Sequence, residues 1–279
     1  MMEDIETTLP AETFTQVERA RNKGASLWLN AIPYEEHGFA LNKQEFRDSI
    51  RLRYNLRLKD LPQKCACEKA FSVEHALSCK QGGFVGMRHD NVKNLLVASI
   101  AKVCKNVQCE PRLLPLDNER FALKSAITGD EARPDIKAGG FWSRGVNAFF
   151  DVRVTHVNSR SKENKSTKEI FESQENEKKR QYNQRVIDVE HGTFTPLVFG
   201  TNGGFGEECG RFITKLAEKL SHKTDESYAT IITWLRTKLS FSILKSVNMC
   251  VRGSRRPFKN PSHGEQMEDF RLNSAVAEI

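Results

Sequence analysis

Apolar side chains recur every three or four residues in the first 60 residues of the chain, and this period predicts helices. It is present in both PAETFTQVERARNKGASLWLNAIP and NKQEFRDSIRLRYNL. A similar stripe runs through HDNVKNLLVASIAKVCKNV and predicts one longer helix. Near the C-terminus apolar residues occupy every fourth position, as in a helix packed on a core; they are Ile231, Leu235, Leu239, Ile243 and Val247.

Between these helical regions the pattern predicts a sheet. Three short apolar segments bounded by turn residues read as strands: VQCEPRLL, RPDIKA and NAFFDVRVTH. A charged helix is expected over about 163–190, and TFTPLVFGTNGG reads as a buried strand that ends in a glycine-rich turn. The order helix, strand, strand, strand, helix, strand, helix predicts an α/β fold with a mixed central sheet flanked by helices.

Changes of pattern divide the chain into four segments. Residues 1–60 are predicted to be helical, and residues 61–88 are short, cysteine-bearing and glycine-rich, as in a small metal-stapled module. Residues 89–252 hold the predicted α/β domain. Residues 253–279 are polar and broken by proline, which predicts a flexible tail.

Charge and composition narrow the class of partner and the compartment. The 279 residues carry a formal net charge of +7, which favours a polyanionic partner. The first 20 residues lack the basic and apolar regions of a secretory signal, and the apolar run SYATIITWL is too short to span a membrane. The close pair Cys65 and Cys67 favours a metal site in a reducing compartment, the cytosol or the nucleus.

Asp135 and Asp151 lie in two of the predicted strands, where an apolar residue is expected. Burying a carboxylate costs several kcal/mol unless positive charge compensates it. The glycine-rich interval between them allows a hairpin that brings both carboxylates to one end of the sheet. Together with the carbonyl of Val152 they could bind Mg²⁺ or Mn²⁺. On spacing alone, aspartates that end strands and cap turns are the commoner arrangement.

Metal-dependent nucleases usually place a lysine near the scissile phosphate, but Arg153 stands two residues after the second aspartate. Arginine stays protonated and cannot act as a base. In the following helix, Phe171, Lys178 and Tyr182 fall on one face, so Lys178 could point toward the sheet. Lys179 is the competing assignment. A lysine extending into solvent from this highly charged helix is the alternative explanation.

The segment CACEKAFSVEHALSC contains Cys65, Cys67, His75 and Cys79 in the pattern C-x-C-x7-H-x3-C. Four such ligands can close a tetrahedral Zn²⁺ site, and a site filled by four protein ligands is structural. A reduced, metal-free turn is the alternative, which the density of cysteine and histidine argues against.

Arg88, His89 and Asp90 follow this cluster at a predicted helix start, where Asp90 suits a cap or a first-turn acid. His89 could contact a phosphate or orient a metal-bound water. A structural hydrogen bond is the other role open to it.

These motifs together resemble a known family. The cysteine-histidine knuckle, then Arg-His-Asp, then Arg-Pro-Asp and a second acid are similar to the C-terminal region of non-LTR retrotransposon proteins that carry a restriction-like endonuclease of the PD-(D/E)XK superfamily. The upstream segment SLWLNAIPYEEHGFALNKQEFRDSIRLRYNL resembles the part that precedes the knuckle in those proteins. The resemblance covers about residues 25–252.

The resemblance implies a PD-(D/E)XK-like nuclease core in a nuclear, retrotransposon-derived protein that cleaves target DNA to prime reverse transcription, with element RNA as a further partner. It makes Asp135 and Asp151 the acids that bind Mg²⁺, Lys178 or Lys179 the displaced lysine, and the knuckle a structural Zn²⁺ site. The oligomeric state stays open. Basic residues expected to contact DNA are Arg88, His89, Arg133, Arg153, Lys162, Lys165, Lys168, Lys179 and Arg180.

Three departures from the family pattern bear on activity. The interval between the two acids is slightly longer than usual, and the lysine two residues after the second acid is absent. No polymerase motif of the Tyr-x-Asp-Asp type is present, so the chain is not expected to copy RNA. The alternative function is a nucleic-acid-binding module that keeps the zinc site and has lost cleavage.

Overall fold

The computed structural model of the protein describes residues 11–114 and 133–253. The sheet within them has four strands in the order β1-β2-β3-β4. The pairs β1/β2 and β2/β3 are antiparallel and β3/β4 is parallel, so the prediction of a mixed central sheet is confirmed. The strands are β1 (Lys105–Cys109), β2 (Ile136–Gly139), β3 (Asn147–Thr155) and β4 (Thr193–Gly200).

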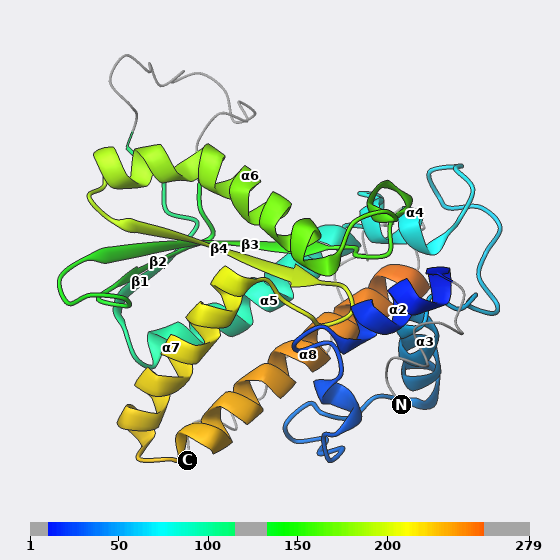
Figure 1. Ribbon diagram of the computed structural model, residues 1–279, viewed down its shortest axis with the longest axis horizontal. Coiled ribbons are helices and arrows are strands. Elements are labelled where there is room, and N and C mark those ends of the chain that lie inside the picture. Colours follow the sequence, from blue (N-terminus) through cyan, green and yellow to red (C-terminus); the bar gives the residue numbers. More distant parts are fainter. Residues whose placement is uncertain (1–10, 115–132, 254–279) are drawn as a thin grey trace, which may run out of the picture.

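Helices cover both faces of this sheet (Figure 1). One face packs against α5 (Phe84–Ala101) and α7 (Glu207–Thr224), and the opposite face packs against α6 (Thr167–Asp188). The long helix α8 (Tyr228–Arg252) packs against α5 and α7. Ser166 begins α6 with a capping box that pairs it with Glu169. Among the described helices, none has both the length and the apolar character needed to cross a bilayer.

Alternation along β3 decides which side chains reach which helices, because successive strand residues face opposite sides of a sheet. Phe150 and Val152 belong to the main core with α5, α7 and α8; the Phe150 and Phe212 ring centroids are 5.0 Å apart. Phe149 packs instead with Tyr182 on the α6 side. The residues that share the orientation of Phe149 therefore face α6, and the next of them is Asp151.

The N-terminal elements pack on α8 and on the loops that follow β3 and β4. They are α2 (Ala11–Arg21), the 3₁₀ turn η1 (Leu27–Leu29) and α3 (Lys43–Arg53). Trp28 and Phe39 form a cluster with Phe241 of α8, and the buried Asp48 carboxylate lies 2.7 Å from the Arg252 guanidinium. The described part of the predicted segment 1–60 is thus helical and shares apolar contacts with the last helix of the predicted domain 89–252.

The short helix α4 (Val73–Ser78) and the 3₁₀ turn η2 (Arg160–Lys162) complete the described elements. Ala76 and Leu77 of α4 are buried in the main core, so the cysteine-histidine segment is anchored to the body of the protein. Of the predicted tail 253–279, all but Gly253 lies outside the described residues. The strand boundaries shift from the expected ones, since β1 begins two residues earlier and Asp135 lies just before β2.

Candidate functional site

The register of the β2/β3 pair brings the two predicted acids together. Ile136 pairs with Phe150 in an antiparallel ladder, so Asp135, just before Ile136, and Asp151, just after Phe150, occupy neighbouring positions on adjacent strands. Both side chains are withdrawn from solvent; the residues are 9% and 3% exposed, respectively. The structure therefore brings together the two carboxylates that the sequence singled out.

A lysine from α6 reaches this acidic pair. The Lys178 ammonium lies 2.8 Å from Asp151 Oδ2, and it also stands 5.6 Å from the centre of the Tyr182 ring. Burial raises the pKa of Asp151, the neighbouring Asp135 raises it further, and Lys178 opposes both effects. A second cation at this point would therefore relieve repulsion that a single lysine leaves between two buried acids.

A hydrogen-bonded chain fixes Asp135. Its Oδ2 accepts a 2.6 Å bond from the backbone N–H of Val152, and His89 Nε2 lies 3.0 Å from the same oxygen. The second ring nitrogen of His89 is 3.3 Å from an Asp90 oxygen, which Lys93 also contacts at 3.0 Å. The bond to Asp135 is the main cause of the raised pKa of His89. An imidazole between two carboxylates is favoured in its doubly protonated form.

Tyr182 holds the segment that precedes Asp135, and it was not among the predicted site residues. Its hydroxyl donates a 3.2 Å bond to the carbonyl of Arg133, two residues before the acid, and its ring is buried. Burial and the nearby Asp151 raise the pKa of Tyr182, so it stays a neutral donor. Its place on the face of α6 that contains Lys178 is the signal that could have identified it.

The other basic residues predicted at the site lie away from the acids. Lys179 contacts Glu208 of α7 at 2.6 Å, and Arg153 contacts Glu177 at 2.9 Å. Lys178 is thus the lysine that meets the sheet, as its helical offset predicted, while Arg153 does not occupy the space next to Asp151. Side chains exposed to solvent are those of Arg133, Lys165, Lys168 and Arg180.

Burial argues against one predicted DNA contact, and internal hydrogen bonds argue against another. Arg88 is only 5% exposed, because it lies on the inner face of α5, so its guanidinium is not presented to a phosphate on the surface. Lys162 donates to the carbonyl of His156 at 3.0 Å and to the Thr155 hydroxyl. Burial lowers the pKa of Lys162 to about 8. Arg88 therefore belongs to the interior of the protein, whereas the half-buried Lys162 ammonium is engaged by acceptors of its own chain.

The buried Glu175 carboxylate lies one turn before Lys178 on α6 and predicts a pH-dependent stability. It accepts a bond from the Glu208 N–H at 3.2 Å, and burial raises its pKa to about 7. The folded protein therefore retains a proton that the unfolded chain releases above pH 4.5, so stability falls as pH rises from there to about 7.

Replacing Glu175 with Gln keeps the acceptor oxygen and removes the charge. We expect the variant to be more stable than the wild type at pH 8 by about 1–3 kcal/mol, and to lose this pH dependence. Urea unfolding at several pH values measures both effects. Equal stability of the two proteins at pH 8 would contradict the assigned burial.

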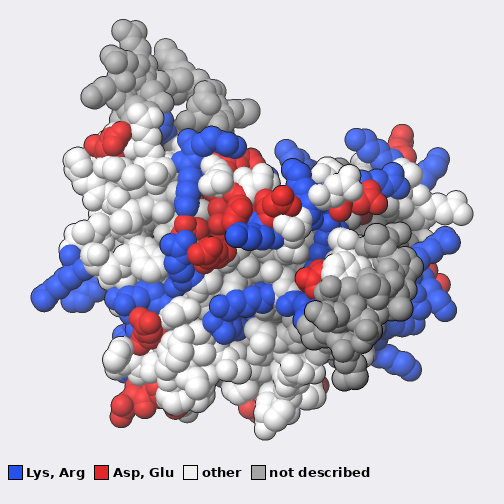
Figure 2. Space-filling view, viewed as in Figure 1, with Lys and Arg blue, Asp and Glu red and all other residues white. Residues whose placement is uncertain are grey.

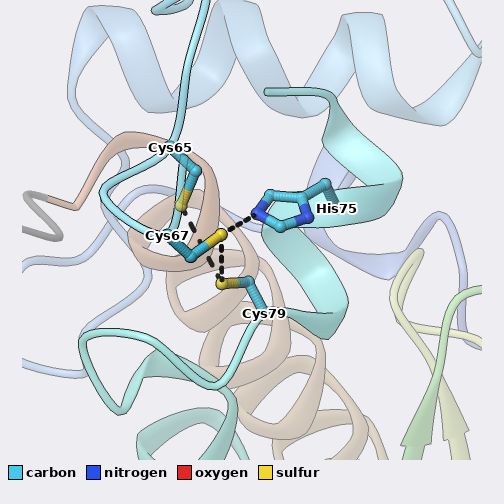
Figure 3. A group of neighbouring side chains, drawn as sticks. All are labelled: Cys65, Cys67, His75 and Cys79. Atoms are coloured by element: carbon cyan, nitrogen blue, oxygen red, sulfur yellow. Dashed lines mark hydrogen bonds between the residues drawn. The ribbon is translucent and has the colours of Figure 1, made fainter. Parts of the chain in front are cut away.

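The four predicted metal ligands lie together in one cluster (Figure 3). Cys65 and Cys67 lie in a tight turn, closed by a 2.9 Å bond from the Glu68 N–H to the Cys65 carbonyl. His75 lies on α4 and Cys79 directly follows it. All four ligand atoms are within 4.8 Å of one another.

The spacing of the ligand atoms suits zinc. Cys65 and Cys79 sulfurs are 3.8 Å apart, Cys67 and Cys79 sulfurs 3.9 Å, and Cys67 Sγ lies 3.3 Å from His75 Nε2. Sulfurs at about 2.3 Å from a tetrahedral centre lie about 3.8 Å apart. A bond from backbone amide groups lowers the pKa of Cys67, whereas burial raises that of Cys79. The cluster can hold a metal ion such as zinc.

Acidic as well as basic side chains gather on the face that shows α6 and α7. Figure 2 shows a central group of Asp and Glu side chains with Lys and Arg around it. Glu207 and Glu208 belong to the first turn of α7, where negative charge is favoured by the helix dipole. This face is therefore not uniformly basic, although the net charge of the protein is +7.

No protein-family model matches this chain, and no curated protein matches it.

Proposed function

We propose that the protein is a Mg²⁺- or Mn²⁺-dependent DNA endonuclease with a PD-(D/E)XK-like core, whose cut primes reverse transcription. The observation that supports it is the pair of buried carboxylates, Asp135 and Asp151, with the Lys178 ammonium 2.8 Å from the second. An acid pair beside a lysine is a set that supports metal-dependent cleavage of phosphodiesters.

The oxygen donors at the site fit a hard divalent cation. Two carboxylates are present, and their mutual repulsion raises the pKa of Asp151. The Val152 N–H points to Asp135, beyond the end of β2. Because the N–H and C=O of a strand residue face the same neighbour, the Val152 carbonyl faces that side as well. Two carboxylates and one carbonyl, with water and substrate oxygen, make up a coordination sphere of the kind Mg²⁺ prefers.

Each residue of the site has its own role in the proposed hydrolysis. A divalent cation held by Asp135 and Asp151 would polarise the phosphodiester and activate a water for attack. Lys178 is placed to orient the attacking water and to offset charge that develops on the phosphate. His89 and the Val152 N–H both contact Oδ2 of Asp135 and hold its carboxylate in place. Tyr182 fixes the segment before Asp135 through the Arg133 carbonyl, which keeps the two acids in register.

Lys178 and Lys179 form a matched pair of test positions, because they are adjacent and contact different acids. Lys178→Met is expected to lower the rate of Mg²⁺-dependent plasmid nicking by about 10²-fold, since it removes the ammonium beside Asp151. Lys179→Met breaks the ion pair with Glu208 and should change the rate by less than about threefold. Initial rates of plasmid relaxation, with circular dichroism as the control for folding, measure both. Equal losses would argue against the assignment of Lys178.

The exposed basic residues around the site are proposed to contact phosphates flanking the cut. Arg180 and Lys168 of α6 are exposed, and Lys168 makes a loose 3.7 Å pair with Glu172. Contacts of this kind release counterions, so DNA binding should weaken steeply as salt rises. Fluorescence anisotropy of a labelled duplex in increasing KCl, with Ca²⁺ in place of Mg²⁺ to prevent cleavage, measures the slope. A flat response would contradict the phosphate contacts.

A binding module without cleavage is the second candidate, and the position of Arg153 bears on it. Were Arg153 to occupy the space beside Asp151, the site would hold a fixed positive charge in place of a mobile lysine. Arg153 instead pairs with Glu177 of α6 at 2.9 Å, so it does not take the place of Lys178 beside Asp151. That arrangement supports cleavage over binding alone.

In either case we propose a structural zinc ion in the cysteine cluster, a nuclear site of action, and element RNA as a further partner.

A further inference from the structure

A cavity of about 520 Å³ lies apart from the acidic site, among the N-terminal helices, α4 and the core. His156 and Asn158 after β3, and Thr201 and Asn202 after β4, line one side of it. These residues follow the carboxyl ends of the two parallel strands, the place where open α/β sheets bind ligands. Asp151 lies four residues before the end of β3, about 13 Å along the strand.

The polar side of the cavity carries an excess of positive charge. Among the described residues that line it, Arg53 and Arg160 are basic and Glu74 is acidic. Glu74 is already engaged, because it accepts a 3.3 Å bond from the Arg160 N–H. The Arg160 side chain is exposed to solvent, so its guanidinium is available to an anion in the cavity.

Further positively charged side chains contact the residues that line the polar side of the cavity. Lys162 donates to the His156 carbonyl at 3.0 Å, and Arg19, 3% exposed, donates to Asn158 Oδ1 at 3.2 Å. Burial, reinforced by Lys162, Arg88 and Arg19, lowers the pKa of His156 to about 4. Within the described part of the chain, two nitrogens of the buried Arg88 have no hydrogen-bond partner. Positive charge concentrated in this way, with Arg19 and Arg88 buried, is stabilised by an anion placed near it.

The other side of the cavity is apolar. Leu52, Val73, Leu77, Leu244 and Val247 line it, and Leu56 at its edge is 52% exposed. Tyr54, which follows the lining residue Arg53 in sequence, is 42% exposed, and the Arg53 guanidinium lies 5.4 Å from the centre of its ring. Exposed aromatic and apolar side chains next to arginine form a stacking surface for nucleic-acid bases.

We propose that this cavity binds one nucleotide of a single-stranded nucleic acid, with the phosphate beside Arg160 and Arg53 and the base against the apolar wall. The enclosed volume is of the size that takes a small organic ligand. It suits one unstacked nucleotide, whereas the bases of a duplex are stacked and paired. The site is separate from the acid pair, so its test is binding and does not depend on cleavage.

The proposal is tested by fluorescence anisotropy without Mg²⁺. A labelled oligothymidylate and a duplex of equal length are each titrated with the zinc-loaded protein. Arg160→Ala is expected to weaken single-strand binding by about tenfold and to reduce the slope of log K against log salt by about 0.7. Leu56→Ala should weaken it by about threefold with the slope unchanged. Arg144→Ala, at an exposed arginine in the loop between β2 and β3, is the matched control and should bind as the wild type.

The proposal is overturned if Arg160→Ala and Arg144→Ala bind the oligonucleotide equally well. Equal weakening of duplex and single strand by Arg160→Ala also overturns it, because that result assigns Arg160 to general contact with DNA. A further outcome is that the wild-type protein binds thymidine monophosphate but not the oligonucleotide. That result would identify a free nucleotide as the ligand and would overturn the proposal that the cavity binds a single strand.

Discussion

Asp151→Asn is expected to abolish metal-dependent cleavage, with a rate at least about 10²-fold below that of the wild type. The carboxylate is 3% exposed and belongs to a strand that is buried on both sides. An amide of the same shape removes one anionic donor, so affinity for a divalent cation falls as well as the rate. The same loss is expected for Asp135→Asn, because its oxygen is held by the Val152 N–H and His89.

The matched control for these two variants is Asp188→Asn, since Asp188 is an exposed acid at the end of α6. It should cleave at the rate of the wild type. All three variants should bind DNA in Ca²⁺ and show unchanged far-ultraviolet circular dichroism. Full activity in Asp151→Asn would show that the buried acid pair is not the metal site.

Loss of the cysteine cluster is expected to produce the largest effect on stability. Cys79→Ser, or removal of the metal by a chelator, should lower the midpoint of thermal unfolding by roughly 10 °C. The cluster closes a segment with little core of its own, but Ala76 and Leu77 of α4 are buried against α8 in the main core. Releasing the ligands therefore frees α4 from the body of the protein and exposes part of that core.

Cys109→Ser provides the control for the cysteine variant, because Cys109 is exposed on the edge strand β1 and lies outside the cluster. It should unfold at the temperature of the wild type. Metal analysis of the purified protein is expected to find one zinc ion per chain, and Cys79→Ser should lose it. A protein that contains no zinc and is insensitive to chelators would contradict a structural metal.

Much of the site could be predicted because its residues follow simple periods. The hairpin that pairs Ile136 with Phe150 follows from two short strands around a glycine-rich turn, and it places Asp135 beside Asp151. Lys178 falls on the sheet side of α6 because it lies seven residues from Phe171 and four from Tyr182. The three cysteines and the histidine of the cluster are local in sequence, so their spacing alone predicted that they lie together.

The remainder depends on contacts between distant segments. Arg88 sits next to His89, yet one is buried and the other reaches Asp135, and only the orientation of α5 on the sheet decides between them. The cavity beside His156 requires α3, α4 and α8 to meet at the ends of β3 and β4. The apolar periodicity of one helix or strand does not reveal which distant elements it will contact.

Incubation of supercoiled plasmid with the purified wild-type protein in Mg²⁺, and in Mn²⁺, tests the central claim most directly. We predict relaxed plasmid in either metal, no reaction in Ca²⁺, and resealing of the nick by DNA ligase, which requires the 3′ hydroxyl that priming needs. A protein that retards DNA in a gel and leaves the plasmid supercoiled in both metals would contradict the nuclease and leave the binding module.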